Sequence, residues 1–136
     1  MRVVLDTNVL VAALLTQGTP PGQLYSAWRA RQFVLCSCEQ QIEEIERVSR
    51  RPFFKAHLAR GAAGRMVNDI RALALMCDPL PRVEAAPDPD DSFLLAIAQA
   101  ARAEFLVTGD RSGLLGLRKR GVTAIVTARV FLQRIE

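Results

Sequence analysis

Short apolar runs alternate along the chain with longer segments in which apolar residues recur every three or four positions. The short runs predict buried strands at 1–5, 33–36, 82–85, 105–108 and 122–126. The longer segments predict helices at 8–15, 19–31, 37–52, 62–77, 91–102 and 127–135. Strands that alternate with helices are typical of a parallel sheet with helices on both faces. The pattern therefore predicts an α/β fold, a Rossmann-like three-layer α/β/α sandwich with a parallel sheet of about five strands.

Local signals mark where several of these helices begin. Thr19 is followed by two prolines, which is a start signal because proline fits the first helical turn and threonine caps it. Ser37, with Gln40 three residues later, has the spacing of a capping box. Pro52 is expected to end the helix that Ser37 opens, and Thr127 is expected to cap the last helix.

The length and the distribution of apolar residues exclude several protein classes. The 136 residues fit one domain, 1–136. The longest apolar run, from Val9 to Leu15, is far shorter than the roughly 18 residues of a membrane-spanning helix. Asp6 interrupts the first apolar stretch, so the N-terminus lacks the layout of a signal peptide. We therefore expect a cytoplasmic protein with no membrane contact.

The cysteines and the charges add little to this picture. Three cysteines, an odd number, indicate a reducing compartment, and we expect Cys36 and Cys38 to be small buried residues rather than zinc ligands. Lysine and arginine number 18 against 14 acidic residues, which gives a net charge of +4. Most of these cations are arginine, whose guanidinium suits phosphate. The excess is compatible with an anionic partner, although many soluble domains carry as much.

Acidic residues follow the two best-defined predicted strands at the point where each strand ends. Asp6 comes directly after Val-Val-Leu, and Asp110 follows Leu-Val-Thr-Gly. Because functional crevices of open α/β sheets lie beyond the carboxyl ends of the strands, both acids are expected at one edge. Asp91 and Glu44, each near the start of a predicted helix, can reach the same edge. Four carboxylates there would form a cage of hard oxygen ligands, which suits Mg²⁺ or Mn²⁺ rather than zinc.

Each of these acids also has a purely structural interpretation. Asp6 and Asp110 could be ordinary turn residues. Asp91 could act only at the start of its helix, as a cap or a charge that favours the helix dipole. For Asp88 and Asp90, just before it, we expect this structural role. Glu44 could belong to a solvated helix face, because three other glutamates lie close to it in the sequence.

Four segments together resemble a PIN domain. They are Val-Leu-Asp-Thr-Asn-Val at 4–9, the segment 37–52 with Glu44, Asp-Pro-Asp-Asp-Ser-Phe-Leu-Leu-Ala-Ile-Ala at 88–98 and Leu-Val-Thr-Gly-Asp at 106–110. Each motif is weak alone, but the ordered set is specific and spans essentially the whole chain. In length the chain is similar to the VapC-like toxins of type II toxin–antitoxin modules.

The resemblance implies a PIN-like fold and a metal-dependent endoribonuclease that hydrolyses phosphodiester bonds of single-stranded RNA. It implies one or two Mg²⁺ or Mn²⁺ ions as cofactors. It places the catalytic and metal-binding acids at Asp6, Glu44, Asp91 and Asp110, and polar residues that orient them at Asn8, Thr108 and Ser112.

Two positions leave details of this site open. Members of the family often have a further acid where this chain has Ser112, which leaves open whether a second metal ion is well held. Glu43 stands beside Glu44, so the register of the second acid is open, although the downstream Pro52 favours Glu44.

The resemblance also implies partners: RNA, a small antitoxin protein and a second copy of the chain in a homodimer. Arg47 and Arg51, four residues apart on the predicted helix, and Arg111 after the fourth acid are candidates to bind the RNA backbone. An apolar groove around Leu24, Trp28 and the 53–76 region is a candidate antitoxin site, although Trp28 equally fits the core.

Other α/β families fit the sequence less well. A phosphatase of the haloacid-dehalogenase type needs a second aspartate two residues after Asp6, where Asn8 stands. A nucleotide-binding protein needs a glycine-rich loop after the first strand, and Asp6-Thr7-Asn8 contains no glycine. The remaining alternative is a catalytically weak or inactive PIN-like module that binds RNA or a protein partner.

Overall fold

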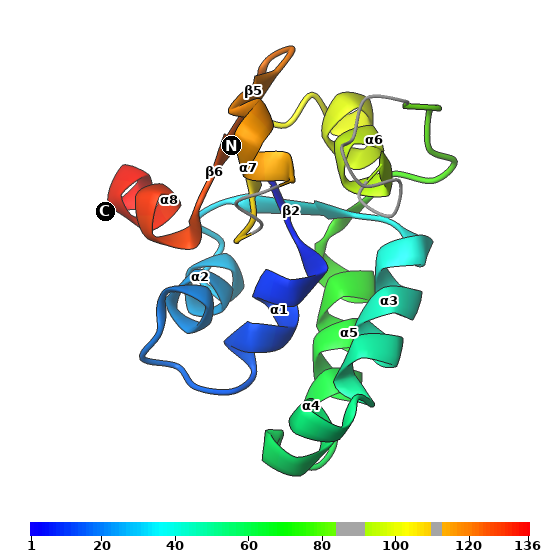
Figure 1. The fold of residues 1–136 in the computed structure, drawn as a ribbon, viewed down its shortest axis with the longest axis vertical. Coiled ribbons are helices and arrows are strands. Elements are labelled where there is room, and N and C mark those ends of the chain that lie inside the picture. Colours follow the sequence, from blue (N-terminus) through cyan, green and yellow to red (C-terminus); the bar gives the residue numbers. More distant parts are fainter. Residues whose placement is uncertain (84–91, 110–112) are drawn as a thin grey trace.

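The computed structural model describes residues 1–83, 92–109 and 113–136. In these residues six strands form a single sheet in the order β3-β2-β1-β4-β6-β5 (Figure 1). Neighbouring strands are parallel except β5 and β6, which are antiparallel. The strands are β1 (Arg2–Leu5), β2 (Val34–Ser37), β3 (Leu75–Met76), β4 (Phe105–Val107), β5 (Lys119–Arg120) and β6 (Thr123–Val126).

Helices connect the strands, and several begin where the sequence predicts. The side chains of Thr19 and Thr127 cap their helices as expected, and Asp6 caps the first helix. The helices are α1 (Thr7–Ala13), α2 (Pro20–Arg29), α3 (Glu39–Ser49), α4 (Pro52–His57), α5 (Ala62–Leu73), α6 (Ser92–Ala101), α7 (Leu114–Leu117) and α8 (Ala128–Ile135).

The strand residues alternate between two hydrophobic cores, one on each face of the sheet. Val3, Leu5 and Val107 belong to the core that also contains residues of α1, α2, α3, α5 and α8. Val4 and Leu106 point the other way, into the core formed with α6 and α7. Successive strand side chains point to opposite faces, so both faces need a helical cover. The predicted three-layer α/β/α sandwich is confirmed.

The two covering layers differ in thickness (Figure 1). On its face of the sheet, α6 supplies most of the buried helical residues, whereas the other face is shared among five helices. A helix that is buried on most of its sides is apolar nearly all round. Seven of its ten residues are accordingly buried: Phe93, Leu94, Leu95, Ala96, Ile97, Ala98 and Ala101.

Ser37 does not cap a helix, contrary to the prediction. It is the last residue of β2, and α3 begins at Glu39 with Cys38 in the N-cap position and no side-chain cap bond. The Ser37 hydroxyl donates instead to the Gln41 side chain at 2.6 Å. The sheet therefore extends one residue further than the predicted strand, and the hydroxyl is used inside the protein.

The third strand also lies elsewhere than predicted. The segment 62–77 is helical only to Leu73, because Leu75 and Met76 pair with the end of β2. Residues 82 and 83 are not in a strand, and residues 84 and 85 lie outside the described part of the chain.

The sheet gains an antiparallel edge strand that the sequence pattern did not predict. Lys119 and Arg120 form β5, which pairs with β6, and a two-residue turn connects the two strands. The turn begins at Gly121, whose φ of +57° is in the left-handed region that glycine adopts without strain. Val122 therefore belongs to the turn, and the predicted strand at 122–126 begins at Thr123.

The prediction that Leu24 and Trp28 line an antitoxin groove is wrong. Leu24 is fully buried and Trp28 is 3% exposed, so both belong to the core.

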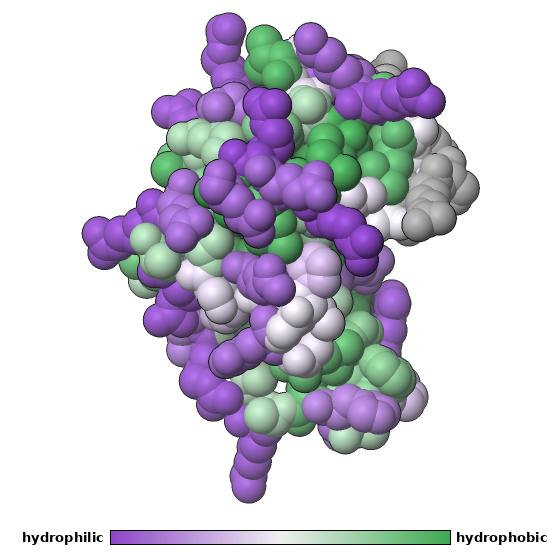
Figure 2. All heavy atoms as spheres, turned by 90° about the vertical axis from the view of Figure 1, so that its left-hand side faces the viewer, coloured by the Kyte–Doolittle hydropathy of each residue, from purple (hydrophilic) through white to green (hydrophobic). Residues whose placement is uncertain are grey.

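On the face drawn in Figure 2, hydrophobic side chains form separate groups among hydrophilic ones. Among the described helices, none is long and apolar enough to cross a membrane.

Cys36 and Cys38 are fully buried, as predicted, and Cys77 is half-buried. Burial raises the pKa of the Cys36 and Cys38 thiols to about 11. All three thiols are free.

We expect Cys36 and Cys38 to resist thiol reagents in the native protein near pH 7. A buried thiol with a pKa of about 11 offers neither thiolate nor access, so only Cys77 is open to attack. Counting modified thiols with and without denaturant measures this. Rapid modification of all three thiols under native conditions would contradict the buried positions.

Candidate functional site

Asp6 is a buried carboxylate at the carboxyl end of β1. The residue is 6% exposed. Its Oδ2 accepts a hydrogen bond from Thr108 Oγ1 at 2.7 Å, and its Oδ1 accepts one from the Asn8 backbone N–H at 3.2 Å. The second bond caps α1, so the structural interpretation of Asp6 is correct in part. A cap uses one carboxylate oxygen, however, and Thr108 engages the other.

Thr108 reaches Asp6 because β1 and β4 pair in register. Leu5 lies opposite Val107, so the next residue of each strand emerges at the same edge of the sheet. Burying a carboxylate costs several kcal/mol unless it is hydrogen-bonded or paired. The Thr108 hydroxyl offsets part of that cost with a charge-assisted bond. Thr108 thus contacts the carboxylate that it is predicted to orient, whereas Asn8 does so through its backbone and has an exposed side chain.

A buried side-chain amide, which sequence reasoning missed, holds the end of β1. Gln41 of α3 is fully buried. Its Nε2 donates to the Leu5 carbonyl at 2.7 Å, and its Oε1 accepts from Ser37 Oγ at 2.6 Å. A signal for it exists in the sequence: Gln41 shares the helical spacing of Ile45 and Val48, which form the inward face of α3. A glutamine on such a face needs buried hydrogen-bond partners.

Glu44 lies one helical turn beyond Gln41 on α3. Its side chain is 20% exposed, and Arg47 Nη2 lies 3.4 Å from its Oε2. Gln40, Glu43, Glu44 and Arg47 line a polar hollow of about 610 Å³. Glu43 is exposed while Glu44 is half-buried, so of the two neighbours Glu44 is turned toward the protein. The register of the second acid stays a prediction.

The remaining predicted site residues, Asp91, Asp110, Arg111 and Ser112, lie outside the described residues. Within 1–83, 92–109 and 113–136, no three His, Cys, Asp or Glu side chains form a group that could hold a metal ion. The four-carboxylate cage therefore stays a prediction. Its described members, Asp6 and Glu44, bring oxygen donors of the kind that Mg²⁺ and Mn²⁺ take, and Asp6 is already held in one orientation.

Comparison with known protein families matches residues 2–112 to the PIN domain. The chain belongs to the PIN-domain family. PIN domains are generally metal-dependent nucleases and typically bind Mg²⁺. The matched residues of this PIN domain run from β1 past β4 and so contain both strand ends that meet at Asp6. Comparisons with curated proteins and with solved structures give no match.

The arginines of the PIN domain are arranged differently from the prediction. Arg47 and Arg51 do not share a helix face, because α3 ends at Ser49 and Arg51 is the N-cap residue of α4. Pro52 starts this separate helix rather than only ending α3. Arg47 lies beside Glu44, whereas the exposed Arg51 lies at the junction of the two helices.

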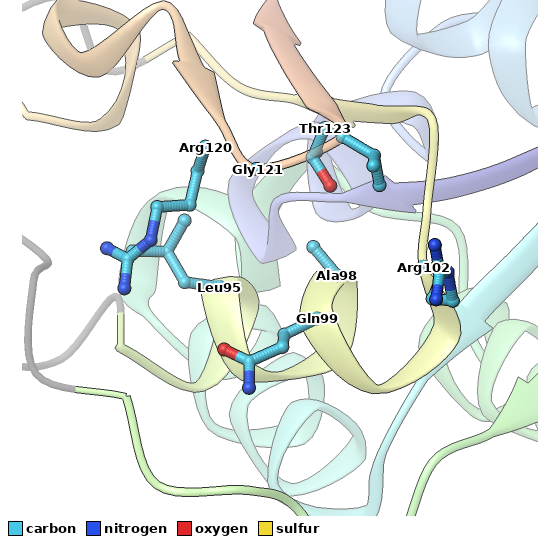
Figure 3. Close-up of a pocket in the computed structure, with 8 residues that line it drawn as sticks. Leu95, Ala98, Gln99, Arg102, Arg120, Gly121 and Thr123 are labelled. Atoms are coloured by element: carbon cyan, nitrogen blue, oxygen red, sulfur yellow. The ribbon is translucent and has the colours of Figure 1, made fainter.

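A second hollow, of about 310 Å³, lies at the other edge of the sheet (Figure 3). It is formed by α6 and the turn between β5 and β6, with Arg102 and Arg120 among its lining residues. Thr123, which opens β6, also lines it. Because β6 begins at Thr123 and runs parallel to β4 and β1, this hollow lies at the amino ends of the strands. Asp6 lies at the opposite, carboxyl ends.

We expect Thr108→Val to destabilise the protein by about 1–3 kcal/mol, because the buried Asp6 carboxylate loses the hydroxyl that donates to it. Thr108→Ser keeps the hydroxyl and is expected to lose much less. Urea denaturation of the three proteins measures the difference. Equal stability of wild type and Thr108→Val would contradict the role given to this bond.

Proposed function

We propose that this PIN domain is a metal-dependent endoribonuclease that hydrolyses phosphodiester bonds of single-stranded RNA. The observation that carries the proposal is the Asp6 carboxylate, buried at the carboxyl end of β1 and fixed by Thr108 from the neighbouring strand. Burying a carboxylate costs free energy, and buried charges in proteins are therefore paired or coordinate metal ions. Membership in a family of nucleases makes metal binding the purpose that fits best.

Asp6, Glu44, Asp91 and Asp110 are the proposed catalytic residues and metal ligands, for one or two Mg²⁺ or Mn²⁺ ions. Held by these acids, such an ion would neutralise charge on the phosphodiester and would make water a stronger acid near neutral pH. The chain's own part is to hold the acids. Thr108 and the Asn8 N–H fix both oxygens of Asp6, and Ser112 is a further proposed orienting residue.

Arginines near the acids are proposed to bind the RNA backbone. Arg47 is 69% exposed at its side chain and lies one turn beyond Glu44 on α3. The ion pair is long, at 3.4 Å, and its arginine is exposed to solvent, so the Arg47 guanidinium can exchange Glu44 for a phosphate at little cost. Arg51 and Arg111 are the other proposed contacts, and the net charge of +4 favours the approach of RNA.

We expect the protein to cut a mixed-sequence single-stranded RNA with Mg²⁺ or Mn²⁺ and not with EDTA. Asp6→Asn and Glu44→Gln are each expected to lower the cleavage rate by about 100-fold or more, since losing a metal ligand costs several kcal/mol of transition-state stabilisation. The asparagine Oδ1 can still accept from the Asn8 N–H, and its NH₂ can donate to Thr108 Oγ1 once that hydroxyl turns, so the side chain stays hydrogen-bonded at both ends while it loses its charge. Gel analysis of end-labelled RNA measures the rate.

Glu46→Gln is the matched control for Glu44→Gln. Glu46 lies on the same helix and is 46% exposed, with Arg50 at 3.6 Å, and its loss is expected to leave the rate unchanged. RNA that is bound but left intact with every metal would instead support the alternative, a PIN module that binds RNA or a protein without turnover. Cleavage that survives both Asp6→Asn and Glu44→Gln would contradict the proposed site.

We further propose that the chain is the toxin of a toxin–antitoxin pair, held by a small antitoxin protein, and that it forms a homodimer. Its induced expression in a bacterium is then expected to stop growth, and Asp6→Asn to restore it. Sedimentation is expected to give twice the chain mass of 15.0 kDa. Unaffected growth would argue against the toxin role, and a monomer at high concentration against the dimer.

A further inference from the structure

The peptide group between Leu5 and Asp6 is hydrogen-bonded on both sides. In an extended strand the C=O and N–H of one peptide group point in opposite directions. The Asp6 N–H donates to the Val107 carbonyl of β4 at 2.9 Å. The Leu5 carbonyl, on the other side, accepts from Gln41 Nε2 of α3 at 2.7 Å. The plane that sets the direction of the Asp6 side chain is thus clamped between β4 and α3.

Gln41 supplies a bond that the sheet itself no longer provides. The ladder between β1 and β2 starts with Val34 N–H donating to the Met1 carbonyl and advances by two residues on each strand. Two steps further, the Leu5 carbonyl comes level with Cys38, where the chain has already left β2 for α3. The side-chain amide of Gln41 takes the place of the missing strand donor.

The amide of Gln41 can adopt only one orientation. The Leu5 carbonyl can only accept, so the NH₂ end must face it. The Oε1 end then accepts from Ser37 Oγ at 2.6 Å, and Nε2 lies 3.5 Å from Thr7 Oγ1. Both Ser37 and Gln41 are fully buried. A buried network in which every partner is satisfied rigidifies its surroundings.

The same contacts fix α3 relative to β1. Gln41 precedes Glu44 by three residues, so the two side chains emerge one turn apart on the same side of α3. An apolar side chain at position 41 would fill the space but would not resist a small slide or rotation of the helix. The directional bonds of Gln41 do resist it.

We propose that Gln41, oriented by the Leu5 carbonyl and held at its other end by Ser37, is a positioning residue that sets the direction of the Asp6 carboxylate and its spacing from Glu44. The inference rests on the proposed function, because the two acids need a fixed spacing only if they share a ligand. Groups that orient metal ligands in this indirect way affect metal affinity or activity by about 10–100-fold when they are removed.

Gln41→Leu tests the proposal, with Thr123→Val as its matched control. Thr123 is 3% exposed and also donates a buried side-chain bond to a carbonyl, that of Ala103 at 2.6 Å, but at the opposite edge of the sheet. Both variants are expected to unfold at lower temperature. Only Gln41→Leu is expected to bind Mn²⁺ more weakly and to have a lower kcat, each by about 10–100-fold, with little change in KM for RNA. Ser37→Ala, which keeps the amide and its bond to Leu5 but removes the donor to Oε1, is expected to fall between wild type and Gln41→Leu.

Amide hydrogen exchange gives a readout that does not depend on metal or activity. The Asp6 N–H is expected to exchange faster in Gln41→Leu than in wild type and to be unaffected in Thr123→Val. Equal Mn²⁺ affinity and kcat in wild type and Gln41→Leu, or equal losses in Gln41→Leu and Thr123→Val, would overturn the positioning role. If the wild type neither binds Mn²⁺ nor cuts RNA, the proposed function fails, and unchanged Asp6 exchange in Gln41→Leu would then overturn the clamp as well.

Discussion

The parallel pairing of β1 with β4 determines what can happen at the carboxyl edge of this sheet. Because Leu5 lies opposite Val107, the residues that follow them leave the two strands side by side, and Thr108 Oγ1 comes within 2.7 Å of Asp6 Oδ2. A shift of the register by one residue would turn Thr108 to the other face and leave Asp6 without this donor. The position of the carboxylate is thus a consequence of how the two central strands pair, and those strands are held by both cores.

The rest of the fold supports this edge from two sides. The helix α3 approaches β1 from the end of β2, and Gln41 ties it to the Leu5 carbonyl, with the half-buried Glu44 one turn further along. The helix α6 packs on the opposite face of the sheet against Val4 and Leu106. These two residues lie two positions before Asp6 and Thr108, respectively. Packing therefore fixes the two strand ends, and hydrogen bonds fix the direction of the side chains at those ends. Both are needed if a carboxylate is to keep a geometry that a metal ion can use.

Much of the fold could be predicted from hydrophobic periodicity and caps, because those signals act locally. Thr19 and Thr127 cap helices as expected, and the central strands lie within a residue or two of their predicted limits. The errors fall where a distant partner decides. Leu75 and Met76 lie within the helix predicted at 62–77, but pairing with β2 makes them a strand.

The candidate site shows the same division between local and distant effects. The position of Asp6 after a strand is readable from sequence, since it needs only the rule that such ends meet at one edge. The role of the Ser37 hydroxyl cannot be read from the sequence, because a serine fits a capping box and a buried hydrogen bond to Gln41 equally well. Gln41 itself carries a readable signal, a polar residue on an inward helix face, but its partner Leu5 lies 36 residues away.

The central claim, that the Asp6 carboxylate belongs to a metal centre, is tested most directly by crystals of the protein grown with Mn²⁺. Anomalous scattering locates the ion without reference to activity. The account predicts a peak at about 2.1 Å from a carboxylate oxygen of Asp6, with Glu44 in the same coordination shell or bound through a water. Crystals that hold Mn²⁺ only elsewhere, or that show Asp6 bound to Thr108 and Asn8 with no ion nearby at saturating Mn²⁺, would contradict it.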